Sequence, residues 1–214
     1  MRFDHEIFFD RYKQLFNTTL SQGQVDGLES ILTAIEQDPD ISDVRWAAYM
    51  MATVKHECAD RWQPIEEYGK GKGRTYGNPV CVTGSDGKKY TNVYYGRGYV
   101  QLTWDYNYKS MSQNILSDDS MYCDPSRALS PEDAYKIMSY GMRRGSFTGK
   151  KLSDYINDKG CDYKNARRII NGLDKWDVIQ GYAQKLETAL KAALLPDAPP
   201  PSDQTADGQP EATQ

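Results

Sequence analysis

Apolar residues recur at the spacing of an α-helix along most of the chain, and this pattern limits the possible fold more than any other feature. The spacing occurs in residues 25–35, 44–54, 134–141 and 176–190. It stops in residues 64–95, where glycine recurs too often for a helix. The sequence therefore predicts a mainly α fold, a helical bundle with one long glycine-rich loop and a small β element.

Residue types that favour helix starts support three of these helices. Ser21 followed by Gln24 fits a capping box, in which two side chains satisfy free backbone N–H groups at the helix start. Ser42 can cap the helix that contains residues 44–54. Ser130 followed by Pro131 predicts the start of another helix, because proline is well suited to the first helical turn.

The glycine-rich interruption contains a candidate β-hairpin. Residues 80–83 and 89–93 are rich in β-formers and flank the turn-forming segment 84–87. The rest of the interruption is a long loop, and long loops inside compact domains are usually functional or disordered.

The length and composition fit one domain followed by an unstructured end. The chain has 214 residues, of which 39% are apolar and 26% charged, so it can form a core of ordinary size. Residues 196–214 are rich in proline and small polar residues and contain no large apolar side chain. We therefore expect a folded domain of residues 1–195 and a disordered proline-rich tail of residues 196–214.

Charge and hydropathy argue against two classes of partner. The net charge of −4 gives no electrostatic reason to expect nucleic acid or an anionic membrane. No apolar run approaches the roughly 18 residues that cross a bilayer. Residues 1–10 lack the apolar segment of a Sec signal peptide. We expect a protein made in the cytoplasm, without membrane insertion, that could leave only by a non-Sec route.

The four cysteines do not form a metal-binding pattern. They stand at positions 58, 81, 123 and 161, without a C-x-x-C pair or a set of histidine partners. Scattered cysteines without an export signal are more often reduced thiols, and a disulfide between Cys58 and Cys81 stays open as an alternative.

The first candidate for chemistry is His56-Glu57, at the end of the apolar stretch that begins at Val44. A helix that ends there can carry the Glu57 carboxyl from the packed interior to the rim of a cleft. A carboxyl partly withdrawn from water keeps its proton to higher pH, which a general acid at neutral pH needs. A solvated last helical turn is the simpler interpretation of the position alone.

The second candidate is Glu66-Glu67, in the irregular segment beyond Pro64. Glu66 follows Glu57 by nine residues, a stretch that can turn back so that two carboxylates face each other across a groove. A gap of about 6.5–9.5 Å between two such groups leaves room for a water and leads to inversion at the anomeric carbon. Paired glutamates on surface loops are common, so this feature is weak by itself.

The most specific feature is Tyr-Gly-Arg-Gly-Tyr-Val-Gln-Leu-Thr at residues 95–103, followed by Asn107. Two glycines around Arg97 allow close backbone approach. Gln101, Thr103 and Asn107 supply the neutral donors and acceptors that sugar hydroxyls and acetamides need. A phosphate-binding loop does not fit, because no Gly-Lys-Ser/Thr follows and the third glycine of a dinucleotide motif is missing.

This segment resembles a motif of glycoside hydrolase family 19, which comprises class I-type chitinases and related bacterial and phage endolysins. Residues 55–57 look like the catalytic His-Glu segment of that family, and residues 167–172 look like its later Arg-Arg-Ile-Asn-Gly segment. The three motifs occur in the family's order over residues 40–190. The chain departs from the family at residues 58–60, where Cys-Ala-Asp replaces the usual small residues, and it has no cysteine-rich chitin-binding module.

The resemblance implies a lysozyme-like fold and a role for each matching residue. Glu57 would be the general acid, Glu66 the second acid with Glu67 as a substitute, and Thr103 would orient the attacking water. No metal or organic cofactor is implied, and Arg97 could orient either Glu57 or Glu66. The positions that the resemblance assigns to substrate binding are His56, Glu67, Tyr95, Arg97, Gln101, Asn107 and Asn171.

We therefore expect a monomeric inverting glycosidase that cleaves β-1,4 linkages in a polysaccharide containing N-acetylglucosamine. Peptidoglycan is the preferred substrate, because the chain is compact, lacks a chitin-binding module and could reach a cell wall through a holin. Chitin or chitooligosaccharides are the alternative, and a toxin delivered to competitors would share the chemistry. A non-catalytic glycan-binding protein on the same scaffold is the alternative of another class, and the presence of both Glu57 and Glu66 argues against it.

Overall fold

A computed structural model describes residues 1–196 of the chain. Its α-helices are α1 (His5–Phe16), α2 (Gln22–Gln37), α3 (Val44–Glu57), α4 (Asp105–Met111), α5 (Ser120–Cys123), α6 (Pro131–Arg144), α7 (Leu152–Tyr155), α8 (Tyr163–Ala166) and α9 (Trp176–Ala193). The strands are β1 (Ile65–Glu66), β2 (Val80–Thr83), β3 (Lys89–Asn92), β4 (Arg97–Gly98), β5 (Ile156–Asn157) and β6 (Gly160–Cys161). Short 3-10 or π turns are η1 (Thr75–Gly77), η2 (Ser112–Leu116), η3 (Pro125–Leu129) and η4 (Arg167–Ile169). The fold is mainly α, as predicted.

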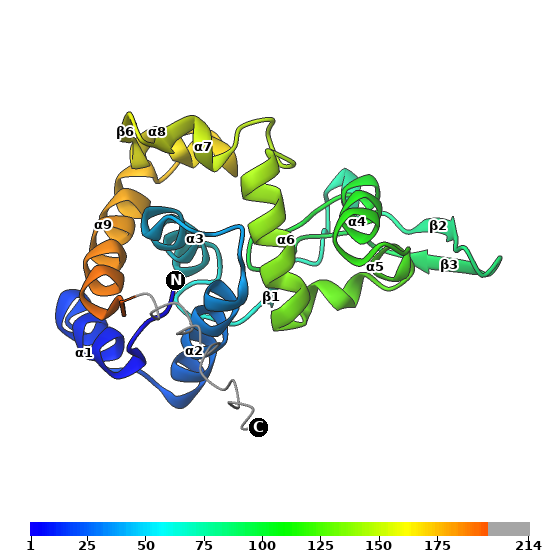
Figure 1. Ribbon diagram of the computed structural model, residues 1–214. Helices are drawn as coiled ribbons and strands as arrows, with labels where there is room; N and C mark the ends of the chain where they lie inside the picture. Colours follow the sequence, from blue (N-terminus) through cyan, green and yellow to red (C-terminus); the bar gives the residue numbers. More distant parts are fainter. Residues whose placement is uncertain (197–214) are drawn as a thin grey trace, which may run out of the picture.

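Helix α3 forms the centre of the larger helical group. Residues 47–55 of this helix are all buried, which is expected of a helix that packs on every side. Its most extensive contacts are with α9, which also packs against α1. In Figure 1, α1, α2 and α9 surround α3, and α6 stands between this group and a second group that contains α4 and α5. Glu57 therefore emerges from the middle of the core.

Two of the predicted helix starts are confirmed and one is wrong. Ser21 caps α2 in a capping box with Gln24, and Ser130 caps α6 by accepting a hydrogen bond from the backbone of Asp133. The cap of α3 is Asp43, not Ser42. The Asp43 carboxylate accepts both the backbone N–H of Arg45 and its guanidinium, so it satisfies more donors than a serine hydroxyl could.

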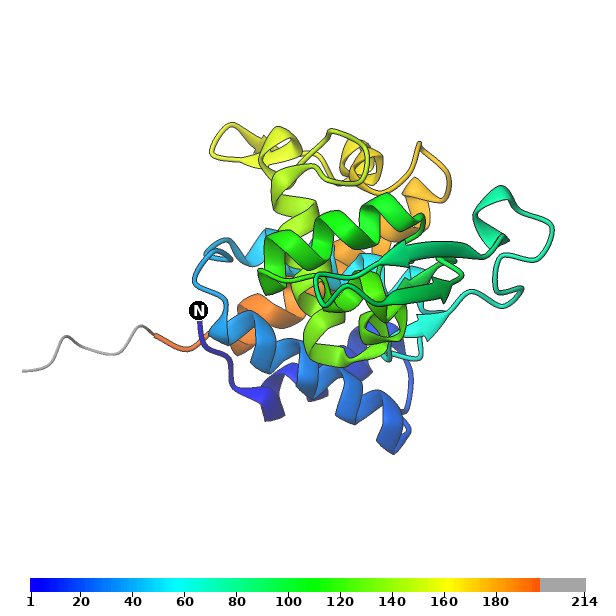
Figure 2. The ribbon, with the colours of Figure 1, turned by 90° about the vertical axis from the view of Figure 1, so that its right-hand side faces the viewer.

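The glycine-rich interruption contains the predicted hairpin. Strands β2 and β3 pair antiparallel from Val80 with Asn92 to Thr83 with Lys89, so the second strand ends at residue 92. Figure 2 shows this hairpin pointing toward the viewer and the loop of residues 67–79 projecting to one side of the body. Glu66, expected in the irregular segment, belongs instead to β1, which pairs with β4.

Several further features of the fold bear on the sequence predictions. All four cysteines are free, so a disulfide between Cys58 and Cys81 is not formed. None of the helices in residues 1–196 combines the length and the hydropathy that crossing a bilayer would require. Helix α1, which was not predicted from the sequence, is capped by Asp4. The tail predicted for residues 196–214 lies outside the described residues from position 197 onward.

Candidate active site

The Glu57 carboxylate projects from the last turn of α3 toward an arginine of the segment after α8. Nη1 of Arg167 donates a hydrogen bond of 2.7 Å to Oε1 of Glu57. Arg167 is only 3% exposed, and its Nε donates to the backbone carbonyl of Asp174 at 3.0 Å. A guanidinium fixed by two partners holds the carboxylate in one orientation. Glu57 itself is 19% exposed, so it is reachable from solvent.

The chain turns sharply after Glu57, and a buried lysine stabilises the turn. Nζ of Lys55 is 2.5 Å from Oδ1 of Asp60 and 2.8 Å from the hydroxyl of Tyr12. The indole of Trp62 also donates to Asp60, at 3.0 Å. Ala59, Asp60 and Trp62 all have positive φ, a conformation that is costly for residues other than glycine. Such backbone strain persists where surrounding contacts enforce it, and here it adjoins the candidate acid.

Three side chains hold the second carboxylate, Glu66. One comes from the loop after β1, and two come from β4 and the residues just before it. The hydroxyl of Tyr95 donates to Oε1 at 2.5 Å, and Nζ of Lys70 lies 2.9 Å from Oε2. Nε of Arg97 lies 3.7 Å from Oε1, which is an ion pair longer than a hydrogen bond. These contacts, the Tyr95 hydrogen bond first, hold the pKa of Glu66 below its ordinary value. Glu66 is therefore favoured as a carboxylate, the form that a general base requires.

The geometry of β4 depends on contacts made by Arg97 and Gln101. The guanidinium of Arg97 stacks on the Tyr95 ring, 3.6 Å from its centroid, and Nη1 donates to the carbonyl of Val93 at 3.0 Å. Nε2 of Gln101 donates to the carbonyls of Ile65 and Gly98, at 3.1 and 3.2 Å. Gln101 thus ties β1 to β4 through its amide nitrogen, a positioning role that the family resemblance did not assign to it.

Thr103 and Asn107 lie on the segment directly after this platform. The Thr103 hydroxyl donates to the carbonyl of Gln101 at 2.9 Å, and Nδ2 of Asn107 donates to the carbonyl of Thr103 at 2.8 Å. Gln101 and Trp104, on either side of Thr103, have φ of 55° and 77°. The side chains of Thr103 and Asn107 are half-buried, so the strained backbone holds these two polar groups at the surface.

The two carboxylate-bearing segments meet at Cys58, the residue after Glu57. Its buried Sγ lies 3.8 Å from the carbonyl oxygen of Gly98 and 3.7 Å from that of Tyr99. Gly98 in turn pairs with Ile65, the neighbour of Glu66. Burial raises the pKa of the Cys58 thiol to about 12, so it stays a neutral packing group. The C-terminal end of α3 therefore packs against the sheet that carries Glu66.

Glu67, the predicted substitute for Glu66, makes structural contacts instead. Its Oε1 accepts a hydrogen bond from the Tyr76 hydroxyl at 2.9 Å, and its Oε2 accepts the backbone N–H of Gly96 at 3.3 Å. Its own N–H donates to the carbonyl of Gly96 at 2.7 Å. The contacts of Glu67 connect the glycine-rich loop to residues 95–103, whereas those of Glu66 involve three ionisable side chains.

An aromatic cluster adjoins these polar groups. The Tyr76 ring meets Trp104 edge-on at 5.4 Å, and Trp104 stacks near Tyr106 at 6.0 Å between centroids. Trp104 and Tyr106 are 37% and 59% exposed, which is unusual for side chains of this size. Exposed aromatic rings with a polar edge suit the apolar faces and hydroxyls of a sugar.

The remaining predicted residues have weaker connections to the carboxylates. His56 is half-buried, and its ring has no hydrogen-bond partner in residues 1–196. Asn171 is exposed, its Oδ1 accepts the N–H of Gly172, and its N–H donates to the carbonyl of Arg167. It therefore lies close in sequence and backbone contact to the arginine that binds Glu57. Within the described residues, no group of three or more histidine, cysteine, aspartate or glutamate side chains could hold a metal ion.

Sequence reasoning missed Arg167 and Lys70 as partners of the two carboxylates. Arg167 lies inside the Arg-Arg-Ile-Ile-Asn-Gly segment that we had singled out, but we assigned a role there only to Asn171. Arg97, proposed for either carboxylate, lies beside Glu66. Lys70 is the fourth residue after Glu66, and a charge pair at that spacing was the available signal.

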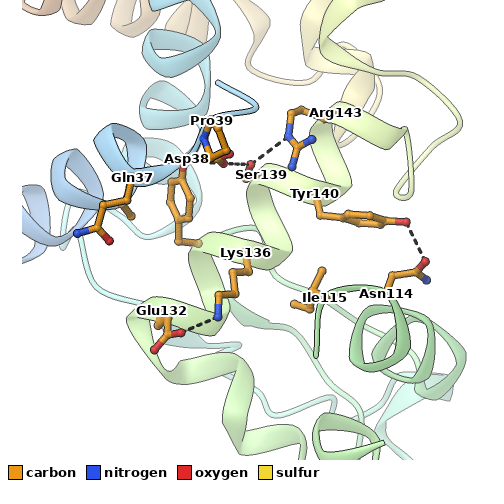
Figure 3. A pocket seen from close by; sticks show the side chains of 12 residues that line it. Gln37, Asp38, Pro39, Asn114, Ile115, Glu132, Lys136, Ser139, Tyr140 and Arg143 are labelled. Carbon is orange, nitrogen blue, oxygen red and sulfur yellow. Dashed lines mark hydrogen bonds and ion pairs between the residues drawn. The ribbon is translucent and has the colours of Figure 1, made fainter. Parts of the chain in front are cut away.

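A separate cavity of about 470 Å³ lies between the end of α2, the face of α6 and η2 (Figure 3). Its polar groups already bind one another. Asp38 accepts hydrogen bonds from Ser139 and Tyr135, and the Tyr140 hydroxyl donates to Asn114. Because none of the predicted site residues lines it, this cavity is distinct from the site around Glu57 and Glu66.

Comparisons with known proteins support the fold. No protein-family model and no curated protein matches the chain. Chitinase C from Streptomyces griseus HUT6037 aligns with a TM-score of 0.54 and 22% identity, over 86% of this chain and 74% of that one. A mutant of chitinase C gives a TM-score of 0.54 and 23% identity over the same shares. A bacterial family 19 chitinase, reported to differ from the plant enzymes, gives 0.53 and 22%, over 83% of this chain and 93% of that one. The chain has the fold of these chitinases.

Proposed function

We propose that this protein is a glycosidase that hydrolyses β-1,4 bonds in a glycan containing N-acetylglucosamine, with inversion. The observation that carries the proposal is that two carboxylates pair with different cations where the end of α3 packs against β1 and β4. Glu57 binds Arg167 on one side, and Glu66 binds Lys70 and lies near Arg97 on the other. Two acids with separate environments are what a one-step hydrolysis with an acid and a base needs.

The proposed reaction is a single displacement. Glu57 donates its proton to the oxygen of the leaving sugar as the glycosidic C–O bond breaks. Glu66 accepts a proton from a water molecule, whose oxygen attacks the anomeric carbon from the opposite face. The low pKa of Glu66 keeps this base ionised, and the Arg167 guanidinium stabilises the Glu57 carboxylate left after proton transfer.

Peptidoglycan is the substrate that we propose, and the exposed rings of Trp104 and Tyr106 support a sugar polymer as the class. Chitin is the second candidate. The specific observation in its favour is that the solved proteins with this fold named above are chitinases.

Product analysis tests the activity and separates the two substrates. Purified peptidoglycan and colloidal chitin would each be incubated with the protein, and the soluble products would be identified by mass spectrometry. We expect muropeptides with new reducing ends from peptidoglycan, and none from either substrate with the Glu57→Gln variant. Binding to the glycans without any new reducing end would favour the non-catalytic alternative, and products from chitin alone would replace peptidoglycan by chitin.

A further inference from the structure

The loop of residues 67–79 is attached to the candidate site at both ends. At its start, Glu67 follows the base Glu66 and binds the backbone of Gly96. Near its end, the Tyr76 hydroxyl donates to Glu67 and its ring packs against Trp104. The loop therefore forms one rim of the site, and Figure 2 shows it projecting from the body.

This loop is folded on itself by a series of turns. The N–H groups of Lys70, Lys72 and Arg74 donate to the carbonyls of the residues three positions earlier, at 2.8–2.9 Å. Gly71 and Gly77 touch through their backbones. A Cβ on Gly77 would lie 1.8 Å from the carbonyl oxygen of Gly71, so only glycine fits there. Such a loop presents its side chains from a defined backbone and loses little entropy when a ligand binds.

The alternation of lysine or arginine with glycine gives residues 67–79 three cations against one acid, Glu67, which is a net charge of +2. Lys70, Lys72 and Arg74 are exposed and lie in a stretch of five residues, although the whole chain has a net charge of −4. Lys70 is paired with Glu66. Neither Lys72 nor Arg74 forms an ion pair with any residue in the described part of the chain. Two cations of the loop that begins directly after Glu66 are thus available to an anionic ligand.

We propose that Lys72 and Arg74 bind carboxylates of the glycan and thereby select peptidoglycan over chitin. The inference rests on the proposed function, because it concerns the substrate of the same site. Peptidoglycan carries carboxylates on its peptide stems, whereas chitin is uncharged. The planar guanidinium of Arg74 can bind a carboxylate through two parallel hydrogen bonds, and the Lys72 ammonium adds an attractive point charge.

The experiment compares one double variant on three substrates. Lys72→Gln/Arg74→Gln removes both free cations and leaves Lys70 with Glu66. Lys89→Gln/Lys150→Gln is the matched control, because it removes two exposed charges outside the loop. The substrates are sacculi stripped of phosphate polymers with hydrofluoric acid, the same sacculi with their carboxylates amidated, and chitohexaose. The readouts are kcat/KM and, for each protein carrying Glu57→Gln as well, co-sedimentation with the sacculi at low and high salt.

We expect the loop variant to lose about threefold to tenfold in kcat/KM on stripped sacculi at low salt, since exposed charge pairs are individually weak and screened. On amidated sacculi and on chitohexaose, the kcat/KM of the loop variant relative to the wild type should match that of the control variant. Equal losses on all three substrates, or no loss on stripped sacculi, would overturn the inference. A parallel assay on sacculi that retain their phosphate polymers would also overturn the inference if the loop variant loses activity only there, because phosphate would then be the ligand.

The two readouts keep this inference separate from the proposed activity. If the wild-type protein cleaves none of the substrates, the proposed function fails, and co-sedimentation still decides whether the loop binds carboxylates. Salt-sensitive binding to stripped sacculi that the loop variant loses and the control keeps would support the inference. Binding that the loop variant retains would overturn it.

Discussion

The Glu57 carboxylate and the Arg167 guanidinium form a 2.7 Å hydrogen-bonded ion pair between positions 110 residues apart. The arginine is buried and also binds the carbonyl of Asp174, so it links the end of α3 to the segment before α9. This one pair both stabilises the packing of the two segments and fixes the orientation of the candidate acid.

Replacing Arg167 by methionine should lower the free energy of unfolding by about 3 kcal/mol, because the partly buried Glu57 carboxylate loses its partner. Urea denaturation would measure the loss. In the double variant Arg167→Met/Glu57→Gln, the neutral glutamine needs no counter-charge, so part of the stability should return. Losses that simply add in the double variant would show that the pair contributes no coupling energy.

Glu57→Gln should lower turnover by about 10²- to 10⁴-fold, because an amide cannot supply the proton that the leaving oxygen needs. The melting temperature should fall moderately, since the amide oxygen can still accept from Arg167 but no longer supplies a counter-charge to this buried guanidinium. Release of reducing sugar, measured beside thermal unfolding, checks both statements. Activity above a tenth of the wild type would remove Glu57 from the role.

The sequence predicted the parts of the site that depend on local pattern. The helix that ends at Glu57 and the hairpin of β2 and β3 follow from periodicity and from turn residues over a few positions. The cap at Asp43 was missed because Ser42 is an equally good local candidate. Only the additional bond from Arg45 decides between them.

Contacts between distant segments could not be predicted in the same way. Arg167 and Glu57 meet only because α8 and η4 follow a chain path that no short pattern describes. The pairing of β1 with β4 involves two residues from each strand, too few for an alternating pattern. The choice between Glu66 and Glu67 depends on which side of that pairing each side chain lies, and a shift of one residue would exchange them.

Tyr95→Phe should move the acidic limb of the kcat/KM profile to higher pH. The Tyr95 hydrogen bond is the largest of the effects that lower the pKa of Glu66, so its loss raises that pKa. Because the base must be ionised, activity would then be lost at a higher pH as the solution is acidified. The hydrogen bond from Tyr95 also makes stability depend on pH. Its contribution to the free energy of unfolding is present above the pKa of Glu66 in the unfolded chain, and it is lost as the pH falls through the lower pKa of Glu66 in the folded protein.

The matched control for this change is Tyr76→Phe, which removes a hydroxyl bound to Glu67 and not to Glu66. Its acidic limb should coincide with that of the wild type. A profile that shifts with Tyr76→Phe and not with Tyr95→Phe would assign the titrating base to Glu67.

Alanine substitutions distinguish the two glutamates directly. Glu66→Ala should cost about 10²-fold or more in kcat and leave ligand binding largely intact. Glu67→Ala removes bonds to Tyr76 and Gly96, so it should mainly lower stability and change kcat less. Single-turnover rates and glycan binding would be measured for both variants. A larger kcat loss in Glu67→Ala would move the base by one position.

The stereochemistry of the first product tests the arrangement of the two acids. A retaining enzyme with a carboxylate nucleophile needs its carboxyl groups only about 5–5.5 Å apart, whereas an inverting one needs about 6.5–9.5 Å for the intervening water. Glu57 comes from a helix end and Glu66 from β1, and each is bound to its own cation. Separate cations reduce any need for the carboxylates to share a proton, as closely spaced acids must.

We therefore expect the α-anomer as the first product from a β-linked glycan. Proton NMR of the fresh reducing end, recorded before mutarotation, would identify it. Chitohexaose is a suitable substrate for this measurement if it is cleaved, because its anomeric signals are resolved and it is soluble. An initial β-anomer would exclude direct attack by water held by Glu66. It would indicate instead that the acetamide of the substrate, or a carboxylate of the protein, attacks the anomeric carbon first.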